Sequence, residues 1–280
     1  MLTFAKMHGL GNDFVVVDAT QHLFTPQGGQ LAALADRHRG VGCDQILVID
    51  PPPPDDPSID FGYRIYNADG SQVGQCGNGV RCLARYVHDH DLSHKPALRV
   101  RTQRATMETH RLPDGRVRVD MGVPHFAPAA LPFNAPHQLA RYTLQLADGA
   151  QVSFGAVSMG NPHAVLEVAD VDQAPVTRLG PLLQQHPVFP EQVNVGFAQF
   201  VDPTHLRLRV FERGAGETQA CGSGACAAAA VGRLWHKLDA HCTVAVRGGE
   251  LDIDWEGEGH PLWMTGTATP VFEGRIEWPK

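Results

Sequence analysis

The 280-residue sequence contains six cysteines but no CxxC pair, and no cysteine has a histidine at zinc-finger spacing. Structural zinc sites are usually built from such closely spaced ligand pairs, so the sequence predicts no metal site. The ordinary role of an isolated cysteine is that of a small buried apolar side chain. We expect that role for Cys43, Cys82, Cys226 and Cys242.

Long apolar runs and an excess of basic residues are also lacking. No uncharged apolar stretch approaches the ~18 residues of a membrane span, and Lys6, His8, Asn12 and Asp13 interrupt the apolar residues near the N-terminus, which argues against a signal peptide. The net charge of -7 argues against a nucleic-acid-binding surface. We therefore expect a cytoplasmic protein with no nucleic-acid or membrane partner, in a compartment where disulfides are rare.

The sequence does contain an internal repeat. GYRIYNADGSQVGQCGNGVRCLA, from Gly62, aligns without a gap with RLRVFERGAGETQACGSGACAAA, from Arg207. The alignment pairs Cys76 with Cys221, and each cysteine begins a CGxG turn. Gly11-Asn12 and Gly160-Asn161 match in the same way at a similar separation. A repeat of about half the chain indicates two similar halves rather than a solenoid.

Each copy of the repeat predicts a strand, a glycine-rich loop and a helix. Polar and apolar residues alternate in 63–66 and 206–211, which is typical of strands. After Gly79, the apolar residues lie on one helical face: Val80, Leu83, Ala84 and Val87. The alanine-rich stretch after Gly224 predicts a buried helix. The proline-rich segment 124–136 is expected to join the halves.

Both repeated cysteines directly precede a predicted helix. A helix N-terminus offers unpaired N–H groups and the positive end of a dipole, so it can lower a thiol pKa and bind a carboxylate. A reactive thiolate, a metal ligand and half of a disulfide are all compatible with one such site, and a duplicated structural cysteine is the alternative for two. Two matched sites favour two-base racemisation or epimerisation, in which one sulfur removes an α-proton and the other returns one.

Four stretches resemble the diaminopimelate epimerase family: KMHGLGNDFVVVD, NADGSQVGQCGNGVRC, GAVSMGNPHAV and ERGAGETQACGSGACAA. The resemblance implies cofactor-independent epimerisation of LL-2,6-diaminopimelate to the meso form, in lysine and peptidoglycan precursor biosynthesis. It implies an α/β (α+β) fold of two pseudo-symmetric domains, each a curled β-sheet or barrel around a central helix. We place these domains at 1–122 plus 269–280 and at 123–268. The resemblance also implies a homodimer.

The site residues follow from the same resemblance. It makes Cys76 the proton donor and Cys221 the acceptor by the family's convention, with His163 and Glu212 supporting the chemistry. Its substrate-binding positions are Asn12, Gln45, Asn67, Gly77, Asn78, Asn161, Asn194, Glu212, Arg213, Gly222 and Ser223. This set of residues suits a substrate with two carboxylates and two ammonium groups, because arginine can bind a carboxylate and amide oxygens can accept ammonium protons.

Two other functions remain to be distinguished. A proline or hydroxyproline racemase-like enzyme would also use two cysteines, and an assay of proline against diaminopimelate separates the two. A redox or metal-binding protein would retain zinc through dialysis and have no epimerase activity. Cys43, two residues before Gln45, is expected to be a packing residue that could line a cleft.

Overall fold

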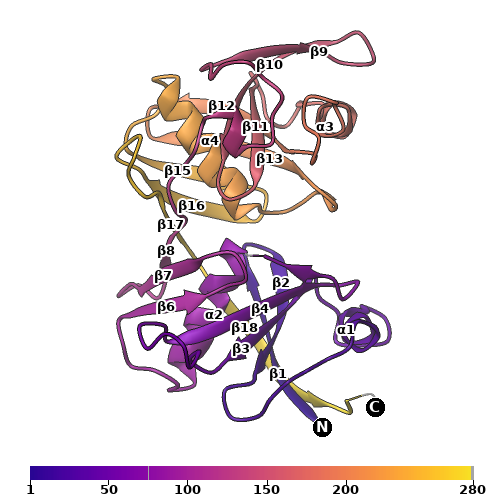
Figure 1. The fold of residues 1–280 in the computed structure, drawn as a ribbon, viewed down its shortest axis with the longest axis vertical. Helices are drawn as coiled ribbons and strands as arrows, with labels where there is room; N and C mark the ends of the chain where they lie inside the picture. Colours follow the sequence, from indigo (N-terminus) through magenta and orange to yellow (C-terminus); the bar gives the residue numbers. More distant parts are fainter. Residues whose placement is uncertain (75, 279–280) are drawn as a thin grey trace. The chain divides into compact units, whose positions relative to one another are not determined.

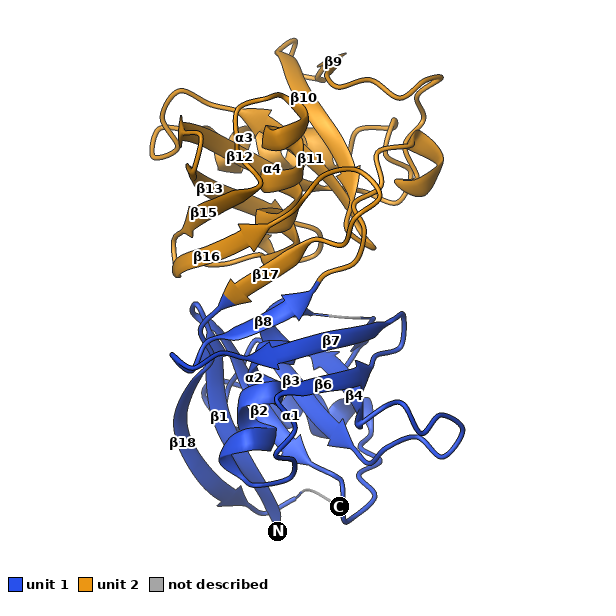
Figure 2. Cartoon of the chain, turned by 90° about the vertical axis from the view of Figure 1, so that its left-hand side faces the viewer, with its two compact units in different colours: residues 1–120, 266–280 blue, residues 121–265 orange. Residues whose placement is uncertain are grey.

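The computed structural model describes residues 1–74 and 76–278. The chain divides into two compact units: unit 1 comprises Met1–Asp120 with Gly266–Lys280, and unit 2 comprises Met121–Thr265 (Figure 2). Each is described by itself below. In the described part of the chain, no helix is long and apolar enough to cross a membrane.

Unit 1 is a curled sheet around one helix, with strand order β8–β7–β6–β4–β3–β2–β1–β18 and β5 paired to β4 (Figure 1). Helix α2 packs against β8 and β18, the first and last strands of this order, as well as against β1, β2, β3 and β7. The sheet therefore wraps around α2. The elements are β1 (Leu2–Gly9), β2 (Asn12–Asp18), α1 (Gly28–Ala35), β3 (Gln45–Asp50), β4 (Phe61–Asn67), β5 (Gln72–Val73), α2 (Gly77–Asp89), β6 (Ala97–Arg101), β7 (Thr106–Arg111), β8 (Val117–Asp120) and β18 (Thr269–Ile276).

Unit 2 has the order β9–β10–β11–β12–β13–β15–β16–β17, with β14 paired to β13. Its central helix α4 packs against β10, β11, β12, β13, β15 and β16. The elements are η1 (Pro128–Ala130), β9 (Tyr142–Gln145), β10 (Gln151–Ser158), β11 (Pro162–Glu167), α3 (Val176–Gln184), β12 (Asn194–Asp202), β13 (His205–Glu212), β14 (Gly216–Glu217), α4 (Gly222–Leu234), β15 (His241–Val246), β16 (Gly249–Asp254) and β17 (Trp263–Gly266).

The two units have the same topology. In both, the second and third of four consecutive strands pair in parallel, β2 with β3 and β11 with β12, and α1 or α3 lies in the crossover. On the side away from β11, β10 pairs with β9. On the side away from β2, β1 pairs with β18, which comes from the far end of the chain. The sequence repeat is therefore a structural duplication, in which β18, near the C-terminus, takes the place beside β1 that β9 takes beside β10.

The predicted local structure is also confirmed. The alternating segments lie in β4 and β13, and the two glycine-rich turns open α2 and α4. The apolar face of α2 is fully covered, because Val80, Leu83, Ala84 and Val87 are each at most 1% exposed. The alanines of α4 are buried, which lets the strands of unit 2 approach this helix closely.

Four cysteines are packing residues, as predicted: Cys43, Cys82, Cys226 and Cys242 are at most 2% exposed. Burial raises the pKa of Cys43 to about 11 and the pKa values of Cys82 and Cys242 to about 12, because the thiolate loses its hydration. The prediction that 124–136 joins the halves is wrong. That segment lies within unit 2, where Leu131 and Phe133 enter the apolar core.

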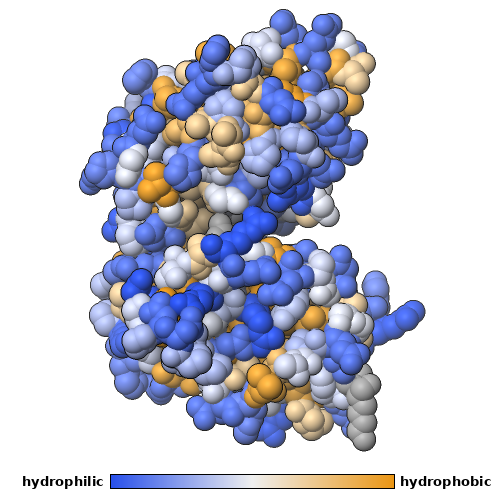
Figure 3. All heavy atoms as spheres, viewed as in Figure 1, coloured by the Kyte–Doolittle hydropathy of each residue, from blue (hydrophilic) through white to orange (hydrophobic). Residues whose placement is uncertain are grey.

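One face of the chain, seen in Figure 3, is mainly polar. Figure 3 shows hydrophilic residues over most of the face in view, with small groups of apolar residues between them. The large exposed apolar side chains include neighbouring residues on one strand, Val271 and Phe272 of β18, at 55% and 50% exposure. Single exposed apolar residues on a protein surface need no special role.

Candidate active site

The two repeated cysteines occupy equivalent backbone positions. Cys76 is the N-cap residue of α2 and Cys221 is the N-cap residue of α4, both with extended backbone angles. Their carbonyl oxygens accept the first helical hydrogen bonds, from Val80 at 3.0 Å and Ala225 at 2.9 Å. Their thiols therefore lie beside the N–H groups of a first helical turn, where an anion is favoured.

Close packing explains the last glycine of each CGxG turn. A Cβ atom on Gly79 would lie 2.2 Å from the Tyr63 hydroxyl on β4. A Cβ atom on Gly224 would lie 3.0 Å from Val210 on β13 and 3.2 Å from the Cys221 sulfur. A side chain here would push the helix start away from the strand, so the repeated glycine is required by the strand-to-helix contact.

Half-site 1, in unit 1, collects the predicted polar residues at one end of β2, β3 and β4. The Oδ1 atom of Asn12 lies 3.9 Å from the Cys76 sulfur and accepts a hydrogen bond from Asn78 at 3.3 Å. Gln45 pairs with Asn67 across β3 and β4 and donates to its Oδ1 at 3.1 Å. These five residues and Gly77 are the members of half-site 1.

Half-site 2, in unit 2, surrounds Cys221. The Cys221 sulfur lies 3.7 Å from the Ser223 hydroxyl, which lies 3.1 Å from His163 Nε2. Asn161 bridges them, because its Nδ2 donates to Ser223 at 3.3 Å and its Oδ1 lies 3.0 Å from His163 Nε2. Glu212 accepts a short hydrogen bond from the Thr218 hydroxyl.

Asn194 and Arg213 complete half-site 2, together with Gly222. The Arg213 backbone N–H donates to Asn194 Oδ1 at 2.9 Å, and Asn194 Nδ2 donates to the Pro162 carbonyl at 3.1 Å. The Arg213 guanidinium donates to the Glu191 carbonyl at 2.9 Å. Asn194 is thus held by backbone groups on both sides, which sets the position of the Glu212–Arg213 turn.

The charge state of half-site 2 differs from the expectation for a helix N-terminus. Burial raises the pKa of the Cys221 thiol well above its usual value, and the Glu212 carboxylate raises it further. The expected lowering is wrong for this cysteine, since loss of hydration and a neighbouring anion outweigh the helix end. Burial, with the Arg213 charge, lowers the pKa of His163 to about 3, so its imidazole is neutral at pH 7.

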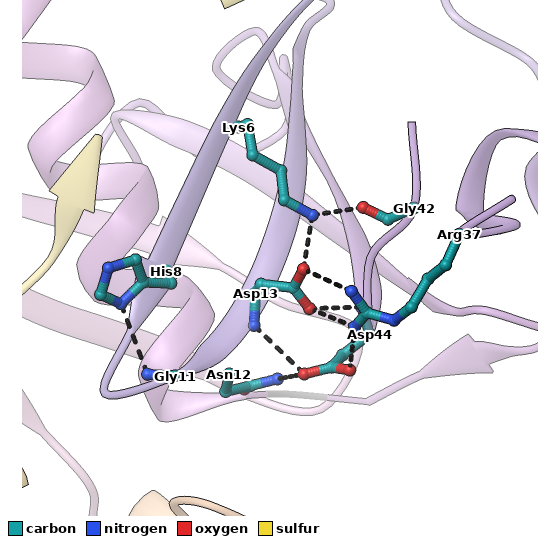
Figure 4. A network of polar contacts seen from close by, with 8 residues as sticks. All are labelled: Lys6, His8, Gly11, Asn12, Asp13, Arg37, Gly42 and Asp44. Atoms are coloured by element: carbon teal, nitrogen blue, oxygen red, sulfur yellow. Dashed lines mark hydrogen bonds and ion pairs between the residues drawn. The ribbon is translucent and has the colours of Figure 1, made fainter. Parts of the chain in front are cut away.

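Several charged residues that adjoin half-site 1 were not anticipated from the sequence. Asp13 accepts hydrogen bonds from Lys6 and Arg37, and Arg37 also bonds Asp44, whose Oδ2 accepts from Asn12 (Figure 4). Asp13 and Asp44 directly adjoin the predicted Asn12 and Gln45 in the motifs GND and DQ. Their position next to predicted site residues in these motifs is the sequence signal that could have identified Asp13 and Asp44.

Among the described residues, no group of three or more His, Cys, Asp or Glu side chains could hold a metal ion. The polar groups around the thiols are amides, a serine, an imidazole and one carboxylate. This set can bind charged groups of a small molecule and move protons at sulfur.

Comparisons with known proteins agree with the motifs. The family model described as diaminopimelate epimerase matches residues 4–127 and 155–271. The chain is 54% identical to the diaminopimelate epimerase of Azoarcus sp. (strain BH72) over 99% of both chains. It is 52% identical to that of Nitrosospira multiformis, over 99% of this chain and 98% of the relative.

A solved structure, a hydroxyproline epimerase from Agrobacterium vitis with bound trans-4-hydroxy-L-proline, has the same fold. The TM-score is 0.71, with 98% of this chain and 91% of the other covered, at 15% sequence identity. This likeness concerns the fold alone. Because the family model and the relatives above span nearly the whole chain, the chain belongs to the diaminopimelate epimerase family.

Proposed function

We propose that this chain interconverts LL- and meso-diaminopimelate by proton transfer at one α-carbon, with Cys76 and Cys221 as the two acid–base groups. The observation that carries the proposal is the equivalence of these cysteines: each caps the central helix of a duplicated unit. The full-length similarity to diaminopimelate epimerases supports the substrate. The wider fold is shared with a hydroxyproline epimerase, so the relatives and not the fold indicate which amino acid reacts.

In the proposed reaction, one sulfur acts as thiolate and takes the α-proton, while the other, as thiol, delivers a proton to the opposite face. The substrate carboxylate gains negative charge as the proton leaves. The helix-end residues would stabilise that charge: Gly77 and Asn78 of α2, and Gly222 and Ser223 of α4. No redox step occurs. Each turnover leaves one thiol and one thiolate with their states exchanged, so Cys221 must lose a proton and Cys76 must regain one before the next turnover in the same direction.

The two half-sites suit different roles in the LL-to-meso direction. Glu212 is close enough to hydrogen-bond the Cys221 thiol. We propose that Glu212 takes the Cys221 proton, so that Cys221 becomes the base. His163, neutral and bonded to Ser223 and Asn161, would hold the polar groups around this sulfur. Cys76, beside the acceptor oxygen of Asn12, would be the thiol that donates.

The remaining predicted residues are proposed to bind the two amino-acid ends of the substrate. Arg213 would hold a carboxylate, and Glu212 would attract an ammonium group. Amide oxygens would accept ammonium protons and amide N–H groups would donate to carboxylates. The amides concerned are Asn12, Gln45, Asn67, Asn161 and Asn194.

We further propose a cytoplasmic homodimer. Cys43, Cys82, Cys221 and Cys242 are thiols, in keeping with a reducing compartment. The end strand β18 carries the exposed Val271 and Phe272, which a second copy could cover.

The test is incubation with pure LL-diaminopimelate in deuterated water. We expect meso product that carries α-deuterium, and loss of turnover in Cys76→Ala and in Cys221→Ala. The matched controls Cys82→Ala and Cys242→Ala remove buried thiols from units 1 and 2 and should retain turnover. Undiminished activity in either of the first two variants would exclude the two-thiol mechanism, and turnover of proline in preference to diaminopimelate would exclude the substrate.

A further inference from the structure

The side-chain amide of Asn12 lies between a carboxylate and the Cys76 thiol. Its Nδ2 donates to Asp44 Oδ2 at 3.1 Å (Figure 4), and its Oδ1 lies 3.9 Å from the Cys76 sulfur. An ionised carboxylate only accepts hydrogen bonds, so the NH2 group of Asn12 must face Asp44. The atom that Asn12 presents to Cys76 is therefore its carbonyl oxygen.

At the other end of this chain of hydrogen bonds lies the Arg81 guanidinium, which can only donate. The guanidinium of Arg81, which is 0% exposed, donates to Asn78 Oδ1 at 3.0 Å. The NH2 group of Asn78 must then face away from Arg81, and it donates to Asn12 Oδ1 at 3.3 Å. From Arg81 through Asn78 and Asn12 to Asp44, every hydrogen bond runs in one direction. Neither amide can be reversed without opposing two donors or two acceptors.

Asp44 is itself held in place, although its side chain is 46% exposed. Its Oδ1 accepts from Arg37 at 2.7 Å, and its Oδ2 also accepts from the Asp13 backbone N–H at 3.1 Å. Its own backbone N–H donates to Asp13 Oδ1 at 2.9 Å. Arg37 and Lys6 both bond Asp13, so the two carboxylates and two cations form one network.

Half-site 2 lacks this arrangement. In the sequence repeat, Cys226 stands where unit 1 has Arg81. In the strand register, Asn194 corresponds to Gln45. The residue before it, Val193, therefore stands where unit 1 has Asp44. There Asn161, the counterpart of Asn12, turns its NH2 group toward the helix and donates to Ser223 at 3.3 Å. Among the described residues, charged groups like Arg81 and Asp44 thus end the chain of hydrogen bonds only beside half-site 1. Asn12 turns its carbonyl oxygen toward its helix, whereas Asn161 turns its NH2 group toward its own.

We propose that Asp44 is a positioning residue: by fixing the Asn12 amide, it presents an acceptor oxygen to Cys76 and keeps this sulfur as the proton-donating thiol. The link to catalysis rests on the function proposed above. The state of the thiol does not depend on that function, because it follows from the donor and acceptor chemistry of Arg81, Asn78, Asn12 and Asp44.

The experiment measures alkylation of Cys76 by iodoacetamide as a function of pH, with the site resolved by mass spectrometry, in Asp44→Asn and Asp44→Glu. Asparagine keeps the shape but can also donate, and glutamate keeps the charge but displaces the oxygens. Both substitutions weaken the hydrogen bond that orients the Asn12 amide. Because the Asn12 oxygen then favours the Cys76 thiol less, the pH midpoint of Cys76 alkylation should move to lower pH. Tyr63, Cys82 and Arg81, which lie close enough to influence Cys76 or its partner Asn78, are unchanged in these variants.

The matched control is Asp50→Asn. Asp50 is the last residue of β3, whereas Asp44 precedes its first, and Asp50 accepts two hydrogen bonds from Arg64 without contacting Asn12. The pH midpoint of Cys76 alkylation in Asp50→Asn should equal that of the parent protein. A parent-like midpoint in both Asp44 variants, or an equal shift in Asp50→Asn, would overturn the proposal.

The catalytic consequence is measured separately. Both Asp44 variants should lose about tenfold or more in kcat/KM for diaminopimelate, since a misplaced proton donor reduces the rate steeply. A shifted midpoint with unchanged kcat/KM would refute a role in catalysis. If the parent protein has no epimerase activity, the proposed function fails, and the alkylation midpoints still decide what Asp44 does to Cys76.

Discussion

The Tyr63 hydroxyl oxygen stands 2.2 Å from the position that a Cβ atom on Gly79 would take. Strand β4 and the first turn of α2 are thus in contact through a tyrosine and a glycine. Within the described residues, this buried hydroxyl has no hydrogen-bond partner. The contact sets how closely the helix that carries Cys76 at its N-cap approaches the sheet.

Gly79→Ala should therefore destabilise the protein by about 1–3 kcal/mol, the usual cost of overpacking a core. Adding Tyr63→Phe should recover part of the loss, because the clashing oxygen is removed. Urea denaturation measures both. Gly28→Ala is the control, since a Cβ at that helical position meets nothing within 4 Å, and it should leave the unfolding free energy nearly unchanged.

Glu212→Gln should lower the pKa of Cys221 toward its ordinary value, because a carboxylate that disfavours the thiolate is replaced by a neutral amide. Alkylation of Cys221 should therefore begin at lower pH, while turnover falls because the proposed proton acceptor is gone. Asp172→Asn, which removes an exposed partner of Arg207, serves as the control. An unchanged or higher alkylation midpoint in Glu212→Gln would contradict the effect assigned to the carboxylate.

Stability should decrease at high pH. The folded state keeps the thiols of Cys43, Cys82 and Cys242 protonated up to pKa values of about 11 to 12, against 9.0 for an ordinary thiol. Between these values the native state binds more protons than the unfolded state, so the unfolding free energy falls as pH rises. Thermal unfolding at a series of pH values above 9.0 checks this. The double variant Cys82→Ala/Cys242→Ala should show a shallower decrease, and an identical slope would contradict the assignment.

Phe272→Asp should convert the proposed dimer into monomers, because it places a charge on the exposed face of β18, where Phe272 is 50% exposed. Sedimentation equilibrium gives the mass of each variant. Leu139→Asp changes a similarly exposed residue of unit 2, at 54%, and should leave the association state as in the parent protein. Monomers already present in the parent protein would rule out the dimer.

Much of the architecture was predictable because duplication leaves a trace in the residues themselves. The matched CGxG turns placed Cys76 and Cys221 at two helix starts, and periodicity indicated the buried face at Val80 and Leu83. The short helices α1 and α3 were not anticipated. They are crossovers between parallel strands, and this role follows from strand pairing rather than from local pattern.

The sequence alone determined the family, the duplicated strand–turn–helix motif and the residue types around each thiol, because these depend on order along the chain. Only the tertiary structure decided their electrostatic setting. Burial and Glu212 raise the pKa of Cys221 against the effect of the helix end. Asp44 and Arg81 orient two amides beside Cys76 from opposite ends. Hydration, charge proximity and hydrogen-bond direction are properties of neighbours in space, and the chain order does not specify them.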